Sequence, residues 1–216
     1  MLVVKKVDDP DAEVAEAAFD VAAELGDRVV ARGLARYADD AVAALKGNVY
    51  GPREQDIATV VALFAGRCVK MIGDIGDKET LPSAVDALRW LVRSPYREAI
   101  EIEPILSSLC KFQDERIVSL LLDLLDDNRL VRTTPDPAGR VAVQTVSDTA
   151  LVNLLRIYGL DADAVHLFRS ETPPGFAGFF SEEERAIATR TFRRWHRENA
   201  EKPREQRGAL TTQPAR

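Results

Sequence analysis

Apolar residues recur every three to four positions along most of this chain, and this spacing predicts a succession of amphipathic helices. Six are expected in the first part of the sequence, at about residues 11–25, 28–46, 54–72, 78–93, 95–112 and 114–127. Glycine-containing turns separate several of them, and Pro104 is expected to kink or split the fifth. The pattern therefore predicts antiparallel helical hairpins.

One stretch of this pattern occurs twice, at residues 77–88 and 114–125. At an offset of 37 residues, Leu81, Val85, Asp86 and Leu88 correspond to Val118, Leu122, Asp123 and Leu125. A period in this range is typical of helical solenoids, in which each repeat packs on its neighbours.

Residues 72–82 contain a small-residue turn, then Asp77, then Leu81 and Pro82 at the start of an apolar helix. This segment resembles the turn and second-helix start of a HEAT repeat, with weaker copies at residues 113–118 and 26–28. The resemblance covers about residues 11–127 and is to bacterial-type HEAT-repeat (armadillo-like helical solenoid) proteins. The resemblance implies an all-α fold in which helical hairpins form a right-handed α-α superhelix. It carries no information about an activity.

The pattern changes after residue 127. Two short β-branched runs, at residues 130–134 and 140–146, flank a turn-forming segment and predict an inserted β-hairpin. Capping-box sequences that begin at Thr145 and Ser181 predict two further helices, ending near Tyr158 and Asn199. We expect three parts: HEAT-like repeats (1–127), a capping module (128–200) and a disordered tail (201–216).

The charge of the chain bears on its partners. There are 29 Lys and Arg against 35 Asp and Glu, a net charge of −6, which argues against a general nucleic-acid binder. No segment is apolar for long enough to span a bilayer, and the N-terminal apolar run is too short for a signal peptide. We take the cytoplasm as the default location, and expect Cys68 and Cys110 to be buried, reduced thiols.

Residues that carry catalytic chemistry are few. The histidines, His166 and His196, lie about 30 residues apart, and neither belongs to a zinc-binding pattern. The glycines of residues 73–77 do not indicate a phosphate loop, because two aspartates there would repel phosphate. We expect no catalytic residue, no cofactor and no metal.

Two features of the surface have alternative interpretations. Arg190, Arg193, Arg194 and Arg197 form one stripe on the last helix, either a docking face for an anionic partner or a solvated face. Trp90 lies outside the apolar stripe of its helix, where it either anchors a partner or packs on a neighbouring repeat.

The favoured hypothesis is a non-enzymatic protein–protein interaction scaffold or adaptor. Its binding surface is expected on residues 78–93 and 114–127, where exposed acids favour a basic or extended partner segment: Asp86, Asp123, Asp126 and Asp127. One alternative is a nucleic-acid-binding or repair protein, since HEAT-like DNA glycosylases use a Trp and an Asp that Trp90 and Asp86 resemble most nearly. The other is a chaperone resembling the HEAT-like chromophore lyases.

Overall fold

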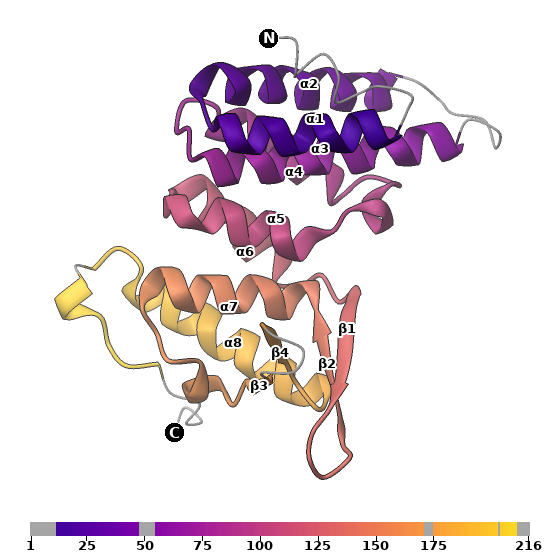
Figure 1. Cartoon of the computed structure of the whole chain (residues 1–216). Helices are drawn as coiled ribbons and strands as arrows, with labels where there is room; N and C mark the ends of the chain where they lie inside the picture. Colours follow the sequence, from indigo (N-terminus) through magenta and orange to yellow (C-terminus); the bar gives the residue numbers. More distant parts are fainter. Residues whose placement is uncertain (1–11, 48–54, 171–174, 203, 211–216) are drawn as a thin grey trace. The chain divides into compact units, whose positions relative to one another are not determined.

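A computed structural model of the chain describes residues 12–47, 55–170, 175–202 and 204–210 (Figure 1). These residues are mostly helical, as predicted, and they also form two small antiparallel sheets. The chain divides into two compact units, residues 1–117 and residues 118–216, with the boundary inside one helix. The sequence placed the change of pattern ten residues later. Each unit is described by itself.

The first unit is built around one central helix. Its helices are α1 (Ala12–Leu25), α2 (Arg28–Gly47), α3 (Gln55–Ile75), α4 (Leu81–Leu91) and α5 (Ile102–Leu109). Helix α3 packs against α2, α4 and α5, because it carries small and apolar side chains on more than one face. Ala58, Ala62 and Ala65 are fully buried, and so is the side chain of Cys68, which forms no disulfide. The core of this unit therefore follows α3.

Helix α3 is longer than the sequence predicts. It continues through Gly73, which the sequence assigns to a turn, and ends at Ile75. A Cβ atom on Gly73 would lie 2.7 Å from the Cβ of Ser108 on α5, so the glycine allows two helices to approach closely. The turn depends instead on Gly76, whose φ of +82° is the left-handed conformation of a helix C-terminus.

Helix α4 begins as the sequence predicts, with Pro82 in its first turn, but its cap differs. Asp77 is a residue type suited to capping this helix, but Thr80 is the N-cap residue and makes no side-chain capping bond. The Thr80 hydroxyl donates instead to the carbonyl oxygen of Asp77, at 3.1 Å. The Asp77 carboxylate is therefore not used to begin the helix.

The predicted helix at 95–112 is split into three pieces. A 3₁₀ turn (Arg97–Ala99) precedes α5, and a second (Cys110–Phe112) follows it. Ile100, between the first 3₁₀ turn and α5, has extended backbone (φ −101°, ψ 119°). Pro104 lies in the first turn of α5. The break therefore comes just before the proline, where the residue's missing N–H costs no helical hydrogen bond.

The second unit combines helices with two short hairpins. The unit boundary falls within α6 (Glu115–Leu124), which is followed by β1 (Leu130–Pro135), β2 (Val141–Thr145), α7 (Val146–Tyr158), β3 (Phe168–Ser170), β4 (Phe176–Gly178) and α8 (Glu182–Asn199). The β1–β2 hairpin is confirmed, but the antiparallel β3–β4 pair is not predicted by the sequence. Two backbone hydrogen bonds between Val143 and Phe179 join the two pairs, at 2.9 and 3.1 Å.

The caps of α7 and α8 agree with the prediction. The Thr145 hydroxyl accepts from the Asp148 amide, and the Asp148 carboxylate accepts from the Thr145 amide at 2.8 Å. At α8 the Ser181 hydroxyl accepts from the Glu184 amide at 3.2 Å. These local signals fix where both helices of the second unit begin.

The tail from residue 201 differs from the prediction of disorder. Among its described residues, Gly208 accepts a hydrogen bond at its carbonyl from Trp195 Nε1 (2.6 Å) and donates its amide to Asn199 Oδ1 (2.9 Å). Leu210 is buried as well. Trp195 and Asn199 are buried polar side chains on α8, and the tail supplies the partners that they need. Within the described ranges, no helix is long and apolar enough to cross a membrane.

Candidate functional site

In the first unit, α2 and α4 pack side by side and run in the same direction. The contacts that join them include Arg32 with Glu79, Asp39 with Ser83 (2.7 Å), and the Lys46 ammonium with the Trp90 ring (5.6 Å to its centroid). Residue numbers rise together in both helices, so the two axes are parallel. We call the outer surface of this pair, which carries Asp39, Asp40, Glu79 and Asp86, the α2–α4 face.

The α2–α4 face exposes all four of these carboxylates. Glu79 is paired with Arg32, and the hydrogen bond from that guanidinium lowers the pKa of Glu79. Asp86 is paired with Arg89 of its own helix at 3.3 Å. The pairings of Glu79 and Asp86 hold Arg32 and Arg89 on the same surface.

The net charge of the chain comes from its first unit. Residues 1–117 contain 15 Lys and Arg and 21 Asp and Glu, a difference of −6. Residues 118–216 contain 14 of each, a difference of zero. Within the first unit the difference belongs to residues 1–27, which contain 2 Lys and 8 Asp and Glu, whereas residues 28–117 contain 13 basic and 13 acidic residues.

The candidate residues of α4 occupy different environments. The Asp86 side chain is 74% exposed. Trp90 is half-buried and lies under the Lys46 ammonium of α2, so it contributes to helix packing and does not project as an isolated anchor. Of the two, Asp86 is the more exposed.

The candidates after residue 117 lie in the second unit. Asp123 is exposed on α6, and Asp127 is half-buried and paired with Arg129 at 2.7 Å. Asp126 accepts a hydrogen bond from Arg193 of α8 at 2.8 Å. The structure therefore brings together two residues that the sequence assigned to separate surfaces, Asp126 and Arg193.

The arginine stripe of α8 is uneven. Arg190 and Arg197 are exposed, whereas Arg193 and Arg194 are half-buried. Arg193 also reaches the carbonyl oxygen of Leu122, at 3.5 Å. At least one of the four charges is thus compensated within the unit, which weakens the stripe as a basic docking face.

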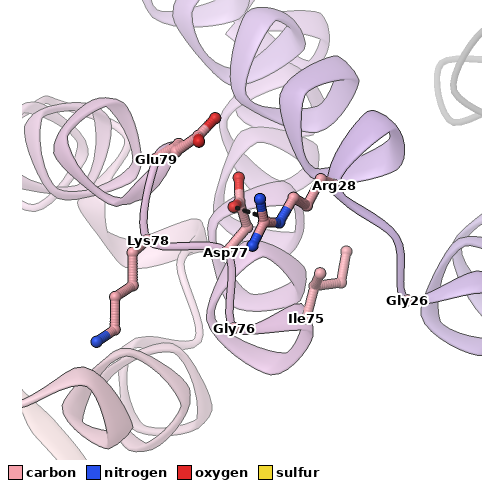
Figure 2. A pocket seen from close by; sticks show the side chains of 7 residues that line it. All are labelled: Gly26, Arg28, Ile75, Gly76, Asp77, Lys78 and Glu79. Atoms are coloured by element: carbon pink, nitrogen blue, oxygen red, sulfur yellow. Dashed lines mark ion pairs between the residues drawn. The ribbon is translucent and has the colours of Figure 1, made fainter.

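A cavity of about 450 Å³ lies where the α1–α2 turn meets the α3–α4 turn (Figure 2). It is lined by Gly26, Arg28, Ile75, Gly76, Asp77, Lys78 and Glu79. The two turns are built alike: Gly26 and Gly76 both have positive φ, and each donates its amide to the carbonyl four residues earlier. Glu79 also belongs to the α2–α4 face, so the cavity adjoins one end of that face.

Asp77 is the unusual residue of this cavity. Its side chain is only 3% exposed, and its Oδ1 lies 3.9 Å from Arg28 Nε, which is beyond hydrogen-bonding distance. Its Oδ2 is buried and has no hydrogen-bond partner among the described residues. The corresponding residue of the other turn, Asp27, caps α2 by accepting from the amides of Val29 (2.6 Å) and Val30 (2.9 Å).

The sequence did not identify Asp77 as a site residue. One signal was present: both Asp77 and Thr80 are suitable N-cap residues for a single helix, so one of them is not needed for capping. The structure uses Thr80 at that position, and Asp77 is left without a capping role.

Elsewhere in the described parts of the chain, no group of three or more His, Cys, Asp and Glu side chains could hold a metal. His196 bonds the Tyr158 hydroxyl at 2.8 Å, and burial lowers its pKa, whereas His166 is exposed. The two histidines are separate from the cavity, which lies in the other unit.

Comparison with known proteins adds no relative. No family model matches this chain, and no curated protein or solved structure shows significant similarity to it.

Proposed function

We propose that this chain is a non-enzymatic interaction module, and that its α2–α4 face binds a basic, extended segment of another protein. The observation that carries the proposal is the cluster of exposed carboxylates on one face of two parallel helices: Asp39, Asp40, Glu79 and Asp86. In this proposal α2 and α4 are the second helices of successive HEAT-like hairpins. Helices α2 and α4 pack in parallel, and α3 contacts both of them, which supports that arrangement.

The dimensions of the face suit a short segment. Helix α2 has 20 residues and is therefore about 30 Å long. An extended peptide rises about 3.4 Å per residue, so roughly nine residues would cover it. Each exposed ion pair contributes only about 0–1 kcal/mol, so several pairs are needed for useful affinity, and their arrangement sets the register.

The proposal is tested with a fluorescent peptide that alternates arginine with serine, whose binding is followed by anisotropy. In the test variant Asp39, Asp40 and Asp86 are all changed to Lys. All three side chains are exposed, and loss of the Asp39–Ser83 hydrogen bond costs only about 1 kcal/mol, so the folded structure should persist while peptide binding is lost. A matching peptide that alternates glutamate with serine should not bind the unmodified chain.

The control variant changes three exposed acids on α1 and α3, Asp20, Glu24 and Asp56, to Lys. It alters the net charge by the same amount, so it separates the position of the charges from their sum. The proposal predicts that this variant keeps most of its peptide binding. Equal loss in both variants would contradict it, and so would tighter binding of duplex DNA than of the basic peptide.

A further inference from the structure

The cavity between the two turns is lined by a carboxylate with one oxygen that accepts no hydrogen bond from the described residues. Asp77 is 3% exposed, and its Oδ2 accepts no hydrogen bond from any described residue. A buried carboxylate oxygen without a donor is unfavourable, because water has been lost and nothing replaces its hydrogen bonds. Such an atom in the wall of a cavity is therefore suited to a ligand that brings a donor.

The neighbouring side chains do not satisfy this requirement. Figure 2 shows Arg28 reaching across the cavity toward Asp77, while Lys78 and Glu79 extend away from it. The Arg28 side chain is 75% exposed, and its Nε stays 3.9 Å from Asp77 Oδ1. Arg28 thus forms an ion pair with the carboxylate but donates no hydrogen bond to it.

We infer that this cavity binds the guanidinium group of an arginine in the partner's basic segment, with Asp77 as the acceptor. The inference rests on the proposed function and adds an anchoring subsite at the end of the α2–α4 face marked by Glu79.

A guanidinium fits this site better than an ammonium ion. It is planar, and it presents two parallel N–H groups to the two oxygens of a carboxylate, whereas an ammonium ion is a point donor. Gly26 and Gly76 form part of the wall, and a Cβ added to Gly76 would meet no atom within 4 Å. The wall therefore leaves space for a flat group beside Asp77.

The same geometry makes Arg28 a competitor. A guanidinium that reaches Asp77 from a ligand takes the place that Arg28 holds near Oδ1. Removing the Arg28 side chain should therefore strengthen binding of an arginine ligand. An anionic ligand would behave in the opposite way, because it would lose the attraction of Arg28.

The test is a titration of the full chain with Nα-acetyl-arginine amide, followed by the amide NMR signals of the cavity residues. Nα-acetyl-citrulline amide, which is neutral and has nearly the same shape, and Nα-acetyl-lysine amide serve as comparison probes. We expect saturable shifts of the Gly26 and Gly76–Glu79 signals with the arginine probe only.

Three variants complete the test. Asp77→Asn should abolish the saturable shifts, whereas Asp56→Asn, an exposed acid at the far end of α3, should keep them. Arg28→Ala should lower the dissociation constant about two- to fivefold, the factor that corresponds to one surface ion pair. This last variant keeps its value as a test if Asp77→Asn fails to fold.

The inference is overturned if the arginine probe causes no saturable shift, if the citrulline or lysine probe acts equally, or if Arg28→Ala weakens binding. In each of these cases the proposed function stands as long as the basic peptide still binds the α2–α4 face. If the peptide that alternates arginine with serine fails to bind the unmodified chain, both the proposed function and this inference are overturned.

Discussion

Asp74 and Asp77 lie three residues apart, but their carboxylates are bonded very differently. Asp74 accepts hydrogen bonds from Lys70 (2.7 Å), Ser108 (2.7 Å) and Lys111 (2.9 Å), whereas Asp77 Oδ2 accepts none from the described residues. Burial alone would raise the pKa of Asp74, but the bonds from Lys70, Lys111 and Ser108 outweigh it and lower that pKa to about 2. Asp74 therefore has a structural role and joins α3 to α5, whereas Asp77 is the residue that we propose for binding.

The difference predicts a pH dependence for Asp74→Asn. The folded pKa of Asp74, about 2, is below its ordinary value of 3.8, so its charge stabilises the folded state above about pH 4. That contribution is lost as the pH falls toward 2. The wild-type chain should thus exceed the variant in free energy of unfolding at neutral pH, and the gap should close in acid.

Urea titrations followed at the amide NMR signals of α3, at several pH values, measure this gap. Asp20→Asn removes an exposed acid of α1 and should leave the free energy of unfolding within about 0.5 kcal/mol at every pH. A gap between wild type and Asp74→Asn that stays constant from pH 7 to pH 2 would show that the charge of Asp74 contributes nothing.

At the scale of elements, the sequence predicts well wherever the signal is local. The caps at Thr145 and Ser181 and the β1–β2 hairpin each depend on residues close together in the chain, and all are confirmed. The β3–β4 pair was missed because strands of three residues carry no alternating pattern. It is held in place by a distant strand: a Cβ on Gly178 would lie 2.7 Å from the Val143 carbonyl carbon.

The same reasoning explains the other differences. In the sequence Gly73 is typical of a turn. Its actual role is a close contact with Ser108, and because that residue is 35 positions away, no local pattern indicates the contact. The polar tail reads as disordered, because the side chains that bind it, Trp195 and Asn199, belong to α8. Asp77 as a site residue depends on which of two possible caps is used, which the sequence leaves open.

The second unit depends on one buried ion pair between elements. Arg185 of α8 donates to both oxygens of Asp148, at 2.8 and 3.1 Å, and to the Val143 carbonyl oxygen at 3.0 Å. Asp148 is fully buried, and burial raises its pKa while the bonds from Arg185 oppose that change. This pair joins α7, α8 and β2.

Arg185→Leu should therefore destabilise the second unit by about 3–5 kcal/mol, because it leaves a buried carboxylate without its counter-charge. Urea titrations followed at the amide signals of α7 measure the loss. Arg190→Leu, an exposed arginine on the same helix, is the matched control and should change stability by no more than about 0.5 kcal/mol.

The double variant Asp148→Asn, Arg185→Leu should recover part of the loss, since no charge is then buried while Asn keeps the α7 cap. Equal stability of Arg185→Leu and Arg190→Leu would contradict the role given to the buried pair.

At the scale of the whole molecule, the distribution of charge is the property that bears most on function. The sequence showed a basic C-terminal region within an acidic chain, with 9 basic and 6 acidic residues from Glu182 onward. The division into units sharpens this: the acids of residues 118–181 balance that excess, and the net −6 belongs to residues 1–117. Interactions of exposed charges fall off over about 10 Å at 0.1 M salt, so the proposed binding depends on the position of the carboxylates on the α2–α4 face and not on the net charge of the unit.

The most direct measurement of this account is a map of where a basic segment binds. The peptide that alternates arginine with serine is titrated into the full chain, and amide NMR shifts are recorded for both units. We predict that the shifted signals belong to exposed residues of α2 and α4, including Asp39, Asp40 and Asp86, and that added salt reverses the shifts. Shifts confined to α1, to the outer side of α3 or to the second unit would contradict the central claim.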